Sequence, residues 1–99
     1  MRALTAGLEN KAILLIDQDP HSCEVRARAF RGRGVLVDCA QSATVARNRY
    51  CVGLYNLVLV DLGADVRGAQ ELAASIRSES PGQKIAFLLG VPPYVRMAP

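Results

Sequence analysis

Residues 13–20 read ILLIDQDP, in which four aliphatic side chains in a row are followed by acidic residues and a proline. A continuous apolar run that stops abruptly is typical of a strand buried on both faces of a parallel sheet. Residues 57–62, LVLVDL, repeat the pattern and again bring an aspartate to the end of the run. We therefore predict two buried strands of one parallel sheet, each leading into acidic residues.

Helix and strand signals alternate along the rest of the chain. Asp19 and Pro20 offer an N-cap acceptor and a proline suited to the first helical position, and Gly32 and Gly34 can end the helix that starts there. Further strands are predicted at 35–39 and 84–89, and further helices at about 42–51 and between residues 62 and 80. Alternation of this kind implies right-handed crossovers and an α/β fold with helices on both faces of the sheet.

The first predicted helix has one small or apolar stripe and many arginines. The stripe consists of Ser22, Val25, Ala29 and Phe30. We predict that it faces the core and that the arginines face solvent. The arginines are Arg26, Arg28, Arg31 and Arg33. A nucleic-acid surface is disfavoured, because the basic cluster offers only Phe30 as a base-stacking aromatic residue and Phe30 is predicted to face the core.

Composition limits the class of protein. The chain has 99 residues, enough for one compact domain, with 51% hydrophobic and 21% charged residues, the balance of a soluble globular protein. No apolar run approaches the roughly 20 residues of a membrane span, and the first ten residues do not resemble a secretory signal, so a cytoplasmic location is expected. The three cysteines and His21 lack metal-ligand spacing, and we predict that the cysteines are structural.

Acidic residues follow both central strands. In an open α/β sheet the functional crevice lies beyond the carboxyl ends of the strands. If the two strands are neighbours, Asp17, Asp19 and Asp61 converge there and repel one another unless a hard cation such as Mg²⁺ bridges them. Asp19 could belong to this acidic group or cap the following helix, and we favour the cap.

Four segments together resemble the receiver domain of bacterial response regulators, the proteins of two-component signalling. They are ILLIDQDP at 13–20, YNLVLVDL at 55–62, RGAQELAASIR at 67–77 and KIAFLL at 84–89. The resemblance covers residues 11–90, with 1–10 as an N-terminal extension and 91–99 as a proline-rich tail. It implies a receiver-like (flavodoxin-like) three-layer α/β fold with a parallel sheet in the order 2-1-3-4, the family's fifth strand and last helix being missing.

The resemblance also implies site residues. Asp17 matches an acidic position that holds Mg²⁺, Asp61 matches the phosphoacceptor, and Gly63 would contribute its backbone carbonyl to the metal. Three departures are expected to weaken this chemistry. Gln18 replaces the second acid and lowers the charge of the metal site, Leu89 stands where the family has a switch serine or threonine, and no lysine matches the one that follows the family's fifth strand.

The function that the resemblance implies is a receiver-like signalling module of a two-component phosphorelay and not an enzyme. Its partner would be a histidine kinase or another signalling protein, with Asp61 as the potential phosphoacceptor and output through protein–protein contact. The alternative is a phosphorylation-independent pseudo-receiver that acts as an adaptor or dimerisation domain. A hydrolase or nucleotide binder is disfavoured because the sequence lacks GxxxxGK[ST], GxGxxG and GxSxG.

The strand predicted at 84–89 would lie at an unprotected edge of the sheet. Such an edge is a template for another strand. Either the tail at 91–97 folds back as an irregular cover, with Tyr94 and Val95 in the gap, or two chains pair through this edge as a homodimer, which we favour slightly. A third possibility is that the sequence is a fragment of a longer receiver.

Overall fold

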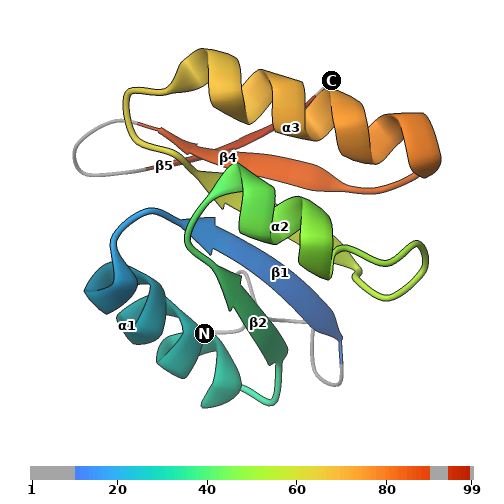
Figure 1. Ribbon diagram of the computed structural model, residues 1–99. Coiled ribbons are helices and arrows are strands. Elements are labelled where there is room, and N and C mark those ends of the chain that lie inside the picture. The colour runs from blue at the N-terminus through green and yellow to red at the C-terminus, as the bar shows by residue number, and fades with distance from the viewer. Residues whose placement is uncertain (1–10, 90–93, 99) are drawn as a thin grey trace.

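The computed structural model describes residues 11–89 and 94–98. Strands and helices alternate along the chain as far as the last strand pair (Figure 1). In chain order the elements are β1 (Ala12–Asp17), α1 (Pro20–Arg31), β2 (Leu36–Ala40), α2 (Ala43–Arg49), β3 (Leu57–Asp61), α3 (Val66–Glu79), β4 (Ile85–Leu89) and β5 (Tyr94–Met97). The predicted elements are therefore confirmed, with ends that shift by a few residues.

One sheet in the order β2-β1-β3-β4-β5 forms the middle layer of the molecule. The first four of these strands are parallel, so the predicted order 2-1-3-4 is confirmed. Helix α1 covers one face of the sheet, and α2 and α3 cover the other (Figure 1). The result is the predicted three-layer α/β fold.

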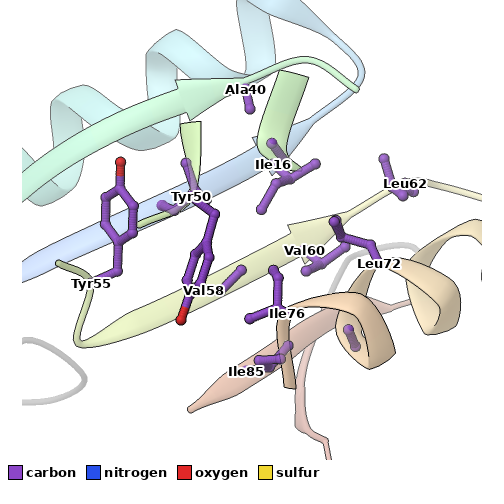
Figure 2. Close-up of a cluster of buried hydrophobic side chains, with 13 residues drawn as sticks. Ile16, Ala40, Tyr50, Tyr55, Val58, Val60, Leu62, Leu72, Ile76 and Ile85 are labelled. Carbon is purple, nitrogen blue, oxygen red and sulfur yellow. The ribbon is translucent and has the colours of Figure 1, made fainter. Parts of the chain in front are cut away.

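The core is divided by the sheet into two clusters, because successive strand residues point to opposite faces. Ile13 and Leu15 pack toward α1, whereas Leu14 and Ile16 pack toward α2 and α3, and all four are fully buried. On the α2–α3 side, the ring of Tyr50 lies among aliphatic side chains of the central strands (Figure 2). Burial on both faces explains why ILLI is apolar at every position.

Helix α1 is rotated relative to the prediction from its sequence. Its N-terminus is as expected, since the Asp19 side chain accepts a hydrogen bond from the backbone N–H of His21 at 3.0 Å. Its buried side chains, however, are Cys23 and Ala27, while Val25 is 51% exposed. The predicted stripe is confirmed for Phe30, which packs against the core, and wrong for Val25 and Ala29, which are exposed. The small side chains of Cys23 and Ala27 face the sheet instead, which a count of large apolar residues does not reveal.

The carboxyl-terminal segment forms a strand that the sequence did not predict. β5 pairs with β4 in antiparallel register, with Phe87 opposite Arg96, and the Ala98 N–H donates to the carbonyl of Ile85 at 3.0 Å. Because β5 occupies the outer edge of β4, that edge is not open to a second chain, and the expected homodimer through it loses its structural basis.

None of the helices in the described residues is both long enough and apolar enough to cross a membrane.

Candidate functional site

Asp17 and Asp61 lie side by side at the carboxyl end of the sheet. They are the last residues of β1 and β3, and the parallel register pairs them directly. The Asp17 side chain is only 5% exposed and that of Asp61 is 20% exposed. The predicted meeting of these two carboxylates is therefore confirmed.

The third predicted acid does not join them. Asp19 is exposed and its carboxylate is used as the N-cap of α1, which confirms the favoured interpretation of that residue. Gln18 is also exposed, and its side-chain oxygen lies 3.5 Å from where a Cβ would stand on Gly63. Accordingly, no cluster of three or more acidic, histidine or cysteine side chains suited to a metal occurs in the described part of the chain.

A cation supplied by the chain itself lies between the two carboxylates. Nη1 of Arg26 is 2.9 Å from Oδ2 of Asp17 and 2.6 Å from Oδ2 of Asp61. The Arg26 side chain is 24% exposed, so the bridge is partly shielded from water. One guanidinium therefore links α1 to the ends of both central strands, and the three side chains of Asp17, Arg26 and Asp61 are called the acidic site below.

Backbone groups occupy the remaining carboxylate oxygens. Oδ1 of Asp17 accepts from the N–H of Asp19 at 3.0 Å, and Oδ1 of Asp61 accepts from the N–H of Gly63 at 3.0 Å. Gly63 has a φ of 58°, the left-handed conformation that favours glycine. All four carboxylate oxygens thus have a donor within the chain, which satisfies two largely buried acids without an external ligand.

The family resemblance implies Mg²⁺ at this place, and the residues present do not fit it. Mg²⁺ requires near-octahedral oxygen ligands at about 2.0–2.1 Å, usually including carboxylates. Here the two available carboxylates already hold Arg26, and Gln18 supplies an amide in place of a third charge. In the acidic site the two carboxylates are therefore neutralised by Arg26.

Leu89, at the predicted switch position, ends β4 and pairs with Tyr94 of β5. Its side chain lies outside what the structure describes. The backbone position at the end of β4 is nevertheless as the resemblance implies, and leucine has no hydroxyl with which to bind a phosphoryl group.

Arg26 is the site residue that our sequence analysis missed. We predicted that it faces solvent, but it lies between Cys23 and Ala27 at the margin of the buried face of α1. Helical side chains lean toward the N-terminus of their helix, which here is the end next to Asp17. The available signal was that two neighbouring buried carboxylates need a cation and that one of them, Asp17, lies just before an arginine-rich helix.

Cys23, Tyr50 and Tyr55 are buried. Burial, reinforced by a hydrogen bond with Cys39, raises the pKa of the Cys23 thiol to about 12, so Cys23 stays protonated near neutral pH. Burial and the hydrogen bond to Asp38 likewise raise the pKa of Tyr55 above its usual value. The predicted structural nature of the cysteines agrees with Cys23, which packs in the core.

A parallel sheet in the order β2-β1-β3-β4, with paired aspartates ending β1 and β3, is the flavodoxin-like arrangement that the resemblance to receiver domains implies. Three solved structures bear this out. The non-phosphorylated receiver domain of HemR from Leptospira biflexa is 24% identical over 79% of this chain and 63% of that chain, with a TM-score of 0.73. The response regulator TrrA from Thermotoga maritima, in complex with Mg²⁺ and BeF, is 28% identical over 76% and 65% of the two chains, with a TM-score of 0.67.

TrrA in its complex with the histidine kinase ThkA is 28% identical over 81% of this chain and 69% of that chain, with a TM-score of 0.71. The predicted resemblance to response-regulator receiver domains is thereby confirmed. The chain spans less than two thirds of the HemR chain and of the TrrA chain in its complex with Mg²⁺ and BeF. No protein-family model matches the sequence, and no curated protein matches it.

Proposed function

We propose that this chain is a receiver-like signalling module that works through protein–protein contact without phosphorylation of Asp61. The observation that carries the proposal is the contact of Arg26 Nη1 with both Asp17 and Asp61. Phosphoryl transfer to a carboxylate needs a free oxygen as nucleophile and a metal to neutralise the phosphoryl oxygens. Here Oδ2 of Asp61 is hydrogen-bonded to Arg26, and the described residues contain no group of three or more acidic, histidine or cysteine side chains that could hold a metal.

Two sequence features support the same proposal. Gln18 removes one charge from the metal site, and Leu89 removes the hydroxyl that would bind the phosphoryl group. Each change acts on a different step, metal binding or phosphoryl recognition. Together with the Arg26 bridge they favour a pseudo-receiver, whose partner would be a histidine kinase or another signalling protein and whose role would not be enzymatic.

The second candidate function is acceptance of a phosphoryl group by Asp61. It is favoured by the place of Asp61 at the end of β3, beside Asp17 and with a side chain that is 20% exposed. The likeness to TrrA, solved both with Mg²⁺ and BeF and with a histidine kinase, supports it at the level of the protein class. For this function Arg26 would have to leave Asp61.

Incubation with a small phosphodonor and millimolar Mg²⁺, followed by intact mass spectrometry, separates the two candidates. TrrA serves as the positive control and Asp61→Asn as the matched negative control. We expect no phosphoryl adduct on the wild-type chain under conditions that modify TrrA. An adduct that disappears in Asp61→Asn would overturn the proposal and establish the second candidate.

A further inference from the structure

We infer that the Arg26 guanidinium takes the place of a divalent cation in the acidic site and keeps such a cation out. The inference deepens the proposed function and rests on the same Arg26 bridge, but it concerns metal binding and not phosphorylation. Mg²⁺ and the guanidinium would each place a positive charge between Oδ2 of Asp17 and Oδ2 of Asp61. The two cations therefore compete for the same pair of oxygens.

The exclusion is first a matter of position. Nη1 of Arg26 lies 2.9 Å and 2.6 Å from the two Oδ2 atoms that face each other across the strand ends. A metal ion bound to both of these oxygens, at about 2.0–2.1 Å from each, would lie too close to the positively charged Nη1 for both cations to remain. Arg26 must therefore withdraw before any divalent cation can bridge Asp17 and Asp61.

Withdrawal is opposed by the way α1 is held. Cys23 and Ala27, three residues before and one residue after Arg26, are 1% and 0% exposed and pack against the sheet. Asp19 fixes the start of the same helix. Because the backbone is anchored on both sides, only side-chain rotation can free the carboxylates, and the tethered guanidinium competes at a high effective concentration.

Charge favours the arginine as well. A divalent cation gains from several anionic ligands, but among residues 11–89 and 94–98 only two carboxylates reach the site, since Asp19 caps α1 and Gln18 is neutral. Their other oxygens already accept backbone N–H groups of Asp19 and Gly63. Mg²⁺ gives up its bound water reluctantly, whereas the guanidinium is weakly hydrated and makes directed hydrogen bonds.

The test compares Mg²⁺ binding by the wild type with binding by Arg26→Met/Gln18→Asp, which removes the tethered cation and restores an acid. Arg28→Met/Gln18→Asp is the matched control, because Arg28 lies on the same helix with a side chain that is 77% exposed. Binding is measured by titration calorimetry and by the carboxyl NMR signals of Asp17 and Asp61. The melting temperature with and without millimolar Mg²⁺ gives a second readout.

We expect no saturable binding and no change in melting temperature for the wild type and for the Arg28 control. For Arg26→Met/Gln18→Asp we expect saturable binding, shifts of both carboxyl signals and a rise in melting temperature on adding Mg²⁺. A folded Arg26 variant that ignores Mg²⁺ would overturn the inference. If that variant does not fold, the wild-type titration tests the inference by itself. Saturable Mg²⁺ binding that shifts the carboxyl signals of Asp17 and Asp61 together would overturn the inference, and a lack of such binding would support it.

The two proposals fail separately. A phosphoryl adduct on Asp61 of a wild type that does not bind Mg²⁺ refutes the proposed function and supports the exclusion of the metal. Saturable Mg²⁺ binding by a wild type that is never phosphorylated refutes the exclusion and supports the proposed function.

Discussion

Replacing Arg26 with methionine should destabilise the fold, and the structure sets the size of the effect. Methionine keeps much of the length of the side chain and removes the charge, so Asp17 and Asp61 lose their shared donor. Asp17 has a side chain that is 5% exposed and would retain only the Asp19 N–H as a partner. Two neighbouring carboxylates without a cation repel each other and are poorly solvated.

Removing one partner of a fully buried ion pair costs about 3–5 kcal/mol. Solvent screening reduces this figure here, because Arg26 and Asp61 have side chains that are 24% and 20% exposed. We therefore expect Arg26→Met to lower the free energy of unfolding by about 2–3 kcal/mol. Arg28→Met should change it by less than about 0.5 kcal/mol, since its contact with Glu24 is 3.8 Å long and exposed.

Urea denaturation followed by circular dichroism measures the difference. With an m-value of about 1–3 kcal/mol per molar urea, the Arg26 variant should unfold at a midpoint on the order of 1 M lower than the wild type. A double-mutant cycle with Asp61→Asn should give a coupling energy of about 1–2 kcal/mol, because part of the lost interaction is already absent in that background. Equal midpoints for Arg26→Met and Arg28→Met would refute the argument.

Three further outcomes follow from single positions. Tyr50→Phe should lower the free energy of unfolding by about 1–3 kcal/mol in urea titrations, because the buried Oε1 of Gln83 loses the hydroxyl that donates to it at 2.7 Å; an unchanged midpoint would contradict this. Gly63→Ala should lower the free energy of unfolding by about 1–2 kcal/mol, because a φ of 58° is strained for alanine. Gly82→Ala, where nothing lies within 4 Å of the added Cβ, should leave it nearly unchanged when both variants are compared by thermal melting. Folding raises the pKa of the Cys23 thiol from 9.0 to about 12, so the protonated thiol contributes to the free energy of unfolding fully below pH 9, and this contribution should be lost as the pH rises toward 12. Cys23→Ala should therefore lose less stability than the wild type between pH 9 and 12, and identical pH profiles of the two would refute this.

The site could be predicted only in part from sequence. Asp17 and Asp61 were predictable because each ends an apolar run, and parallel strands bring their carboxyl ends to one edge. The cap at Asp19 was predictable because an N-cap depends on neighbouring residues alone. The Arg26 bridge was not, since it depends on the rotation of α1 about its axis, which is set by how Cys23 and Ala27 fit against the sheet.

The fold could likewise be predicted only in part, and the edge of the sheet is the part that the sequence did not predict. Apolar runs and caps are local signals, and they were enough to place four strands and three helices along the chain, while the order of the strands in the sheet was implied by the family resemblance. Whether the segment after β4 pairs with that strand depends on contacts between distant residues, such as the bond from the Ala98 N–H to the Ile85 carbonyl. Local chemistry thus settled where the chain forms strands and which strands end in an acid, because both follow from short-range pattern. Only tertiary packing decided which cation neutralises those acids and what covers β4, because each is a competition between groups far apart in the chain.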